Sequence, residues 1–290
     1  MKKYIIFVAL IILLFIIPLQ YKKNQTQTQT SQEEEDCEVF ITLTESNEQI
    51  ALEQYLIGVV AGEMPASFHP EALKAQAIAA RTYAMHQTSF GTTPIKQTTA
   101  HQVFKEERDP KYEEKLKEAV TATKNQILTY NDEPITAMFH AASNGQTESA
   151  QNYSGSTVAY LTTVSTPEEY TDTQTFTLTQ LNDKLQTTLT LAQLQQAEIT
   201  RNNTKRVETI TIGGKTWNGR KFRELLNLKS TDFTITVNTD ITIATKGYGH
   251  GVGMSQYGAN ELAQTGKTAE QILAHYYPNT QMATLACAEQ

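Results

Sequence analysis

The sequence predicts an α+β fold, namely a single mixed ectodomain with a central helix and β-hairpins behind an N-terminal membrane anchor. Segments with apolar residues at helical spacing and short strand-like runs are mixed along the body. There is no alternating strand–helix pattern and no G-x-G-x-x-G after a strand, so a doubly wound parallel sheet is not indicated. The length of 290 residues, of which 39% are hydrophobic and 19% charged, is sufficient for a buried core.

The charge balance excludes two kinds of partner. Acidic residues outnumber basic ones by 31 to 24, which gives a net charge of −7. Four of the 24 basic residues are lysines beside the N-terminal apolar run, so the rest of the chain has 20 basic against 31 acidic residues, or −11. Such a body is not expected to bind nucleic acid, which requires a basic surface, and an anionic membrane surface repels it.

Residues 1–23 are predicted to be a signal anchor with a single transmembrane segment. The uncharged run Ile5–Leu19 follows two lysines, and its length lies between that of a signal-peptide core and that of a full membrane span. No small-residue cleavage site follows, because the chain continues Gln20-Tyr21-Lys22-Lys23. An uncleaved anchor is favoured over a cleaved signal. The expected location is the cell membrane, with the body on the extracytoplasmic side.

Residues 24–36 are polar and acidic and are predicted to be a flexible tether, because nothing in them can form a core. The folded body is expected to span residues 37–290. Cys37 and Cys287 lie at its two ends. Since the ends of a domain often lie close together, an oxidising compartment permits a disulfide between them, and two unpaired cysteines are the alternative.

Helices are predicted where apolar residues recur at helical spacing. Leu52–Ala61 ends at Gly62, a common residue just past a helix. Pro70 begins a helix that runs to about Thr88, and its face of mostly small side chains lets other elements approach closely, so this helix is expected to be central. Further helices are expected at Asp109–Asn125, Ala192–Ile199, Phe222–Leu228, Gly258–Gln264 and Ala269–Tyr277.

Strands are predicted for short runs rich in β-branched residues. Ile127–Tyr130 and Ile135–His140, joined through Asn131 and Asp132, have the pattern of a β-hairpin. Further strands are expected at Arg206–Ile212, Phe233–Val237 and Ile241–Thr245.

Glu63, in the run Gly62-Glu63-Met64-Pro65, is the candidate general acid. A carboxylate just past a helix C-terminus faces the negative end of the helix dipole, which disfavours its ionised form. The apolar neighbours Met64, Pro65 and Phe68 add desolvation. Both effects are expected to raise the pKa of Glu63, as a general acid near neutral pH requires. The alternative, which composition alone favours, is an exposed loop glutamate.

Two further segments are candidate binding loops. Phe139–Glu148 places a polar turn after a hairpin end, which is a common position for binding groups, although ordinary turn formation also explains it. The segment Lys246–Ala259 has five glycines within twelve positions, which indicates a backbone that approaches a ligand closely, and a strained turn without function is the alternative. The candidate residues are His140, Ser143, Asn144, Tyr248, His250, Ser255, Gln256 and Tyr257.

Other chemistry has little support in the motifs. The glycine-rich segment lacks the G-x-x-x-x-G-K-[ST] pattern of a phosphate loop, and Tyr257 replaces a glycine of the G-x-S-x-G nucleophile elbow. There is no H-E-x-x-H motif, and His140, His250 and His275 have no carboxylate or cysteine partner close in the sequence. Two cysteines exclude a four-cysteine zinc site. No metal and no cofactor are expected.

Three motifs, taken together and in this order, resemble the stage II sporulation protein D family. They are GEMPASFHPEALKAQAIAARTYA, then FHAASNGQTE, then GYGHGVGMSQYGA with a later HYYPNT, and the resemblance extends from about Leu52 to Thr280. It implies a membrane-anchored lytic transglycosylase that acts on peptidoglycan during engulfment in endospore-forming bacteria, with Glu63 as the catalytic glutamate. It also implies denuded glycan strands as the substrate, and a sporulation amidase or endopeptidase and a membrane scaffold protein as partners.

The resemblance further implies that the helix after the E-M-P motif contributes polar groups to the glycan cleft. Lys74, Gln76 and Arg81 are the matching residues, and solvated surface cations are the alternative for Lys74 and Arg81. The candidate residues of the other two motifs are expected to position sugars. Some relatives have a zinc site with cysteines near the histidine motif, but Ala142, Ser143 and Asn144 occupy that place here.

A lytic transglycosylase can work with one carboxyl group, whereas hydrolysing glycosidases use two. Glu63 would protonate the oxygen between N-acetylmuramic acid and N-acetylglucosamine and then accept the proton of the muramic acid C6 hydroxyl, which leaves a 1,6-anhydro end. Two other functions stay open. One is a zinc-dependent peptidoglycan amidase that uses His140 and His250, and the other is a non-catalytic glycan-binding scaffold.

Overall fold

Helices and strands are mixed along the chain, which confirms the predicted α+β class. This computed structural model describes residues 38–98 and 100–285, and Val39–Leu285 form one unit by their contacts. Two hydrophobic cores lie within that unit, one built from its two ends and one from its middle.

The predicted anchor (1–23), the tether (24–36) and the cysteine pair (Cys37 and Cys287) all lie outside the described residues, so they stay predictions. Among the helices that the structure describes, none combines the length and the apolar character needed to cross a membrane.

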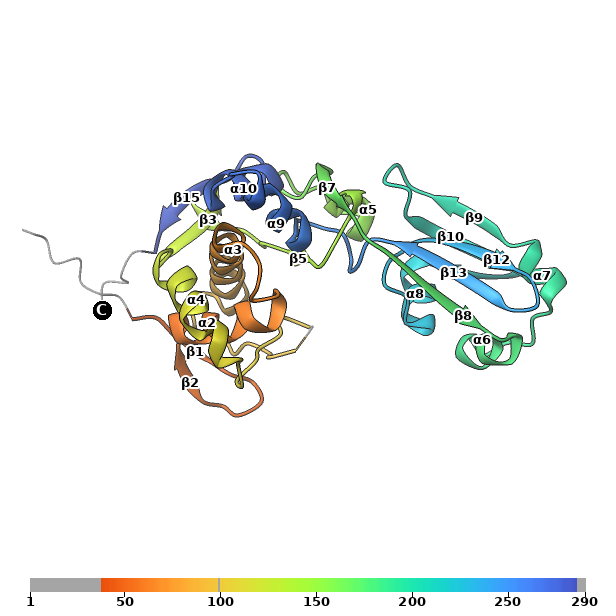
Figure 1. Ribbon diagram of the computed structural model, residues 1–290, viewed down its shortest axis with the longest axis horizontal. Helices are drawn as coiled ribbons and strands as arrows, with labels where there is room; N and C mark the ends of the chain where they lie inside the picture. The colour runs from red at the N-terminus through yellow and green to blue at the C-terminus, as the bar shows by residue number, and fades with distance from the viewer. Residues whose placement is uncertain (1–37, 99, 286–290) are drawn as a thin grey trace, which may run out of the picture. The chain divides into compact units, whose positions relative to one another are not determined.

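Helix α3 (Pro70–Thr88) is the central element of the first core, as predicted. Pro70 occupies its first turn, as predicted, and the His69 side chain caps its start by accepting a hydrogen bond from the Glu71 N–H. Thirteen of its nineteen residues are buried, and many are alanines that let neighbours approach closely. The helices that pack on it are α2 (Leu52–Glu63), α4 (Pro110–Thr121), α9 (Gln256–Gln264) and α10 (Ala269–Tyr276), as Figure 1 shows.

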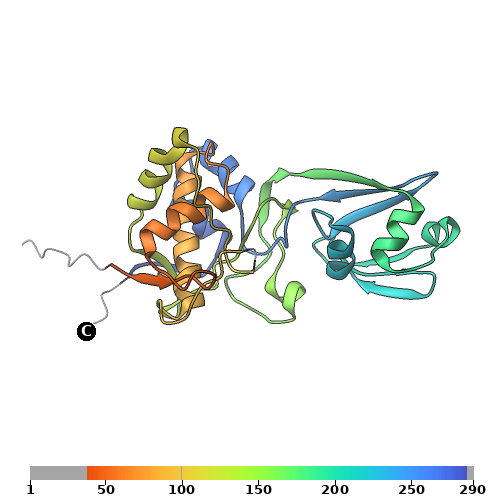
Figure 2. The same cartoon turned by 90° about the horizontal axis from the view of Figure 1, so that it is seen from below.

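Short strands complete the first core. Strand β3 (Gln126–Tyr130) pairs with β4 (Glu133–Pro134) on one edge and with β15 (Gln281–Thr284) on the other. The C-terminal helices, drawn in blue, therefore lie beside the orange N-terminal helices in both views (Figure 1 and Figure 2). The smaller elements are β1 (Phe40–Thr42), β2 (Gln49–Ala51), β5 (Phe139–His140), β6 (Asn144–Gln146), α5 (Ala150–Ser154), β7 (Ser165–Glu169) and β14 (Met254–Ser255).

The second core is built from residues that lie between the histidine motif and the glycine-rich motif. One sheet has the order β12-β13-β8 and the other has the order β11-β10-β9. Strand β8 leads out of the first core and β13 leads back beside it, with Thr171 opposite Lys246. The Gly247 N–H then donates to the Tyr170 carbonyl at 2.7 Å, so the chain returns to the place it left.

Three short helices accompany these sheets, and the rings of Phe222 and Phe233 stack at 5.2 Å between centroids. The elements are β8 (Thr171–Phe176), α6 (Leu178–Leu185), α7 (Leu191–Gln195), β9 (Glu198–Arg201), β10 (Val207–Ile212), β11 (Lys215–Asn218), α8 (Gly219–Leu226), β12 (Asp232–Val237) and β13 (Ile241–Lys246).

The predicted helices are present with shifted ends. Helix α2 continues to Glu63, so this residue lies in the last helical turn rather than past it. Helix α4 ends at Thr121, four residues earlier than the predicted end at Asn125. The helix predicted for Ala192–Ile199 is wrong in its second part, because Ile199 pairs with Ile210 in the β9–β10 ladder.

The predicted β-hairpin is confirmed at its turn and wrong in its second strand. Asn131 and Asp132 both have positive φ, as a tight hairpin turn requires, and β3 pairs with β4. The segment Ile135–His140 does not continue this ladder. Its last two residues form β5, which instead pairs in parallel with β14.

Arg81 links the layers of the first core and has no exposed surface. Its guanidinium donates to both carboxylate oxygens of Glu53, at 2.8 and 2.6 Å. It also donates to the main-chain carbonyls of Gln126 and Val120. Because a buried cation needs both a counter-ion and hydrogen-bond acceptors, this set of contacts ties α3 to α2, α4 and β3.

We expect Glu53→Gln to lower the free energy of unfolding by about 3 kcal/mol, because it leaves the Arg81 cation buried without its counter-ion. Urea unfolding of the purified protein measures this. Lys221→Gln is the matched control, since the Lys221–Glu224 pair is 3.9 Å long and exposed, and its expected effect is within about 0.5 kcal/mol. Equal effects of the two substitutions would contradict the structural role of the Glu53–Arg81 pair.

Candidate active site

The histidine motif and the glycine-rich motif are joined along a main-chain seam. Beyond the β5–β14 pairing, Ala142 and Tyr248 exchange two main-chain hydrogen bonds at 3.0 and 2.6 Å. Gly249 shows why glycine is needed here, because its φ is +108° and an added Cβ would lie 2.9 Å from the Cβ of His140. The close approach that the glycines predicted is therefore, at this position, an approach to the chain itself.

A cleft of about 890 Å³ lies beside Glu63 and is lined by residues of all three motifs. A volume of this size is typical of small-molecule sites. Six of the residues predicted from the sequence line it, namely Glu63, His140, Tyr248, His250, Gln256 and Tyr257. The tertiary structure thus brings together residues that are almost 200 positions apart in the sequence.

Glu63 is a half-buried carboxyl at the end of α2. Its Oε1 accepts a hydrogen bond from the main-chain N–H of Val103 at 2.6 Å. Burial raises the pKa of Glu63, while the Val103 N–H and the Gln256 side chain act in the opposite direction. The direction of the pKa shift is the one predicted from the sequence, and loss of solvent is its first cause.

Gln256 is held in the cleft by Gln76. The Nε2 of Gln256 donates to the Oε1 of Gln76 at 3.3 Å, and Gln76 itself is fully buried in α3. The Nε2 of Gln76 has no hydrogen-bond partner among the described residues. Gln76 therefore reaches the site through Gln256 and does not line the cleft.

Tyrosine rings form an exposed part of the cleft wall. The side chains of Tyr248 and Tyr257 are 38% and 39% exposed, and both rings lie near Tyr170, at 5.8 and 6.2 Å between centroids. The ring of Tyr257 also meets Phe68 edge-on at 5.0 Å. Rings with an apolar face and a polar hydroxyl suit a ligand that has both characters, as a sugar does.

The two histidines of the cleft are uncharged near neutral pH. Burial lowers the pKa of His250 to about 4, and the nearby Arg223 acts in the same direction. Burial also lowers the pKa of His140 well below its ordinary value. One ring nitrogen of His140 lies 3.2 Å from the Val252 carbonyl and the other 2.7 Å from the Ser143 hydroxyl, so its ring orientation is fixed.

Ser143 and Ser255 bind a carboxylate that no motif marked. Glu168, in β7, is buried, and its Oε1 accepts from the Ser143 N–H at 2.8 Å and from the Ser255 hydroxyl. Both serines are fully buried and neither lines the cleft. Glu168 lies in the run STPEE, whose composition gives no signal of such a role.

The remaining predicted residues are also outside the cleft. The Nδ2 of Asn144 donates to the Thr204 carbonyl and to Asp232, which connects the histidine motif to the second core. Lys74 pairs with Glu71 at 2.8 Å and lines a different surface cavity. Arg81 is in the core with Glu53, so the structure does not bring Lys74 or Arg81 to the cleft.

The described residues contain no group of three or more His, Cys, Asp and Glu side chains that could hold a metal ion. The rings of His140 and His250 are 5.7 Å apart between centroids, but both ring nitrogens of His140 already have partners in the chain. The donor set that a zinc amidase needs is therefore not assembled by the described part of the chain at these two histidines.

The family model described as Stage II sporulation protein matches residues 42–130 of this chain. This match places the chain in the class of sporulation proteins. Stage II sporulation protein D of Bacillus subtilis (strain 168) is 44% identical over 266 residues, which cover 84% of this chain and 78% of that protein. The protein of the same name from Bacillus amyloliquefaciens is 43% identical, over 82% of this chain and 76% of its own length. The chain belongs to the stage II sporulation protein D family, as the motifs predicted.

A further relative has a different name. The amidase enhancer of Bacillus subtilis (strain 168) is 31% identical in an alignment of 285 residues. The alignment covers 78% of this chain and 40% of that protein. Its name links it to amidase activity.

We expect Glu63→Gln to change how stability depends on pH. Burial raises the pKa of Glu63 above its ordinary 4.5. Between pH 4.5 and the raised pKa, the folded protein therefore keeps a proton on Glu63 that the unfolded chain has lost. The free energy of unfolding consequently falls as the pH rises through this interval. Glutamine keeps an oxygen for the Val103 N–H and cannot ionise, so the variant lacks this fall.

Urea unfolding of both proteins between about pH 4 and pH 8 measures the difference, in which the other titrating groups cancel. The variant should be the more stable protein at the upper end of this range. Parallel curves for the two proteins would mean that the pKa of Glu63 is not raised by folding.

Proposed function

We propose that the chain is a membrane-anchored peptidoglycan lytic transglycosylase of sporulation, which leaves 1,6-anhydromuramic acid ends on glycan strands. The observation that carries the proposal is the half-buried Glu63, whose pKa burial raises, on the wall of a cleft lined by tyrosines and uncharged histidines. Family membership supports the sporulation context, and the relative named amidase enhancer supports a connection with the cell wall.

In the proposed reaction the Glu63 carboxyl donates its proton to the glycosidic oxygen, and the bond to the muramic acid C1 breaks as positive charge develops on the sugar ring. The Glu63 carboxylate then accepts the proton of the C6 hydroxyl, whose oxygen bonds to C1. Glu63 regains its proton and no water is consumed. The Val103 N–H supports this role because it fixes the orientation of the carboxyl through Oε1.

The other cleft residues would bind and orient the strand. The exposed rings of Tyr248 and Tyr257 offer faces for sugar rings, and the amide of Gln256 lies beside Glu63. The histidines are uncharged near neutral pH, so they add no positive charge that would favour the ionised form of Glu63.

Two other carboxylates decide whether hydrolysis is an alternative. Glu148 is the acidic residue of the second motif, but it does not line this cleft, and its oxygens accept hydrogen bonds from Asn152, Asn202 and Thr204. Glu224, on α8, is exposed and does line the cleft. A hydrolytic mechanism would need a second carboxylate about 5–9.5 Å from the acid, and Glu224 is the residue to test for it.

The membrane attachment and the partners are part of the same proposal. Residues 1–23 would hold the catalytic body on the extracytoplasmic side of the cell membrane. The substrate would be peptidoglycan strands, processed together with an amidase or endopeptidase and held near a membrane scaffold protein. The relative named amidase enhancer supports the connection with an amidase.

We expect the purified full-length protein to convert glycan strands to products with 1,6-anhydromuramic acid ends, each lighter than a hydrolysed end by one water. Glu63→Gln should retain the fold and lower the rate by about 10²–10⁴-fold, the usual effect of losing a general acid. Mass spectrometry of the products, before and after borohydride reduction, distinguishes the two kinds of end because the anhydro end is not reducible.

Glu224→Gln distinguishes the two mechanisms further. If Glu63 is the single catalytic carboxyl, this variant should still form anhydro ends. Reducible muramic acid ends in the wild type, lost in Glu224→Gln, would replace the proposal by hydrolysis. Binding of strands without any cleavage by the wild type would indicate a non-catalytic scaffold.

A further inference from the structure

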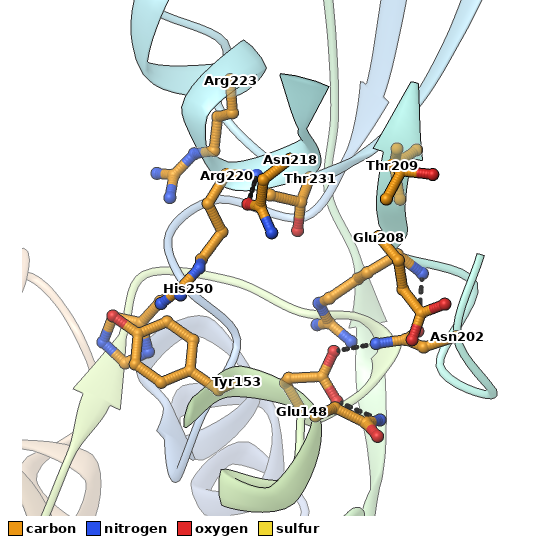
Figure 3. Close-up of a pocket in the computed structure, with 13 residues that line it drawn as sticks. Glu148, Tyr153, Asn202, Glu208, Thr209, Asn218, Arg220, Arg223, Thr231 and His250 are labelled. Atoms are coloured by element: carbon orange, nitrogen blue, oxygen red, sulfur yellow. Dashed lines mark hydrogen bonds between the residues drawn. The ribbon is translucent and has the colours of Figure 1, made fainter. Parts of the chain in front are cut away.

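A second pocket, of about 370 Å³, opens between α5, α8 and β10. Three arginines line it, namely Arg206, Arg220 and Arg223, and we call it the arginine pocket. In Figure 3, Arg220 reaches from α8 towards Tyr153 and His250, and Glu148 lies on another wall. No sequence motif marked these arginines, because they lie in the inserted second core and beside it.

Arg206 lines this pocket and has unused hydrogen-bonding capacity. The residue is only 4% exposed, and its Nη2 donates to the Gln146 carbonyl at 3.1 Å. Its Nη1 is buried without a hydrogen-bond partner among the described residues. A buried guanidinium nitrogen that lacks an acceptor is costly unless a ligand supplies one.

Gly251 of the glycine-rich motif makes room for this guanidinium. An added Cβ at Gly251 would lie 2.4 Å from the Nη2 and 2.7 Å from the Cζ of Arg206. The φ of Gly251 is +85°, which also favours glycine. The motif that lines the cleft therefore also sets the position of Arg206.

The other two arginines are oriented by neighbours that leave donors available. The guanidinium of Arg220 lies over the Tyr153 ring, 4.6 Å from its centroid. Arg223 uses its Nε for the Leu228 carbonyl at 3.1 Å. A guanidinium presents paired N–H donors that match the two oxygens of a carboxylate.

The carboxylates of Glu148 and Asp232 attract the Arg206 guanidinium, but neither accepts a hydrogen bond from its Nη1 or Nη2. The Glu148 carboxylate accepts four hydrogen bonds from neutral groups, from the Asn152, Asn202 and Thr204 side chains and from the Ser149 N–H. Asp232 pairs with Arg201 at 3.3 Å. Glu208 lines the pocket but is exposed.

The arginine pocket adjoins the Glu63 cleft. Tyr153, Arg223 and His250 line both spaces, so a ligand in the cleft could extend a substituent into the pocket. A peptidoglycan strand has carboxylates on the lactyl groups of peptide-free muramic acids, or on the stem peptides where these are present.

Resting on the proposed function for the choice of ligand, we propose that the arginine pocket binds a carboxylate of the glycan strand while the cleft holds its sugars. Arg206 and Arg220 bind this carboxylate directly, and Arg223 stands where the pocket meets the cleft. The pocket then discriminates strands by charge, whereas the cleft recognises sugars.

The test measures binding with the full-length Glu63→Gln protein, so that no strand is cleaved. The ligands are a peptide-free strand fragment, the same fragment with its carboxyls converted to neutral methylamides, a peptide-bearing fragment of equal sugar length, and a chitin oligosaccharide of that length. We expect a carboxylate-bearing fragment to bind about tenfold more tightly than the neutral ones at low salt, the usual effect of a charge-assisted hydrogen bond.

Arginine variants test the pocket itself. Arg220→Gln, at an exposed position, should reduce the preference to about twofold or less without weakening binding of the methylamide fragment. Arg206→Gln should do the same, with circular dichroism as a check on folding because that residue is buried. Lys221→Gln is the matched control on the same helix, and it should retain the tenfold preference.

The fragments also identify the source of the carboxylate. Preference for the peptide-free fragment assigns the lactyl carboxylate, and preference for the peptide-bearing fragment assigns a stem-peptide carboxylate. Equal affinity for charged and neutral fragments, no binding of any fragment, or a preference that Arg220→Gln and Arg206→Gln both leave unchanged would overturn the proposal.

Failure of the pocket and failure of the proposed function are distinguishable. If the wild type forms anhydro ends but the charge preference is absent, the pocket proposal is wrong and the proposal of a lytic transglycosylase is retained. If the preference is present but no anhydro ends form, the carboxylate site stands and the catalytic proposal is wrong.

Discussion

The parallel pairing of β5 with β14 is the contact on which the site depends. It joins Phe139–His140 to Met254–Ser255, and the Ala142–Tyr248 hydrogen bonds extend it. More than a hundred residues separate the two segments in the sequence, and most of them form a second core that leaves through β8 and returns through β13. Because those two strands pair with each other, the chain leaves and returns at the same place, and the insertion is compatible with the β5–β14 pairing. Glycine is required along the seam because a side chain at Gly249 would strike His140.

Burial determines the charge of the cleft. It raises the pKa of Glu63 and lowers the pKa values of His140 and His250, so each of these groups favours its neutral form. The protonated carboxyl can donate a proton, and the uncharged imidazoles add no positive charge beside it. Positive charge comes instead from the three arginines of the adjoining pocket, of which Arg223 also lines the cleft. The two spaces share His250 and therefore present one ligand with two different chemical environments.

Several polar residues of the motifs build the frame of the site rather than its surface. Arg81 binds Glu53, and Ser143 and Ser255 both bind Glu168, all inside the protein. Gln76 holds Gln256, which does line the cleft. A buried polar group must find a partner within the protein, so a motif that folds around a cleft contains both kinds of residue. Residue type alone does not separate them.

The sequence by itself determined the α+β class, the central helix α3 and the three motifs, because helical spacing and capping residues are local properties. It also predicted the direction of the pKa shift at Glu63 from the helix end and the apolar neighbours, but the burial that causes the shift arises from the tertiary structure. It did not predict the parallel β5–β14 pair, the partner of Arg81, or the roles of Glu168, Val103 and the three arginines. Each of these depends on contacts between segments that are distant in the sequence. The stretch from Tyr160 to Asn203 is rich in Thr and Gln, and its strands are stable because they pair within sheets of the second core. Tertiary structure decided which polar side chains face the cleft, because burial and pairing arise only when those segments meet.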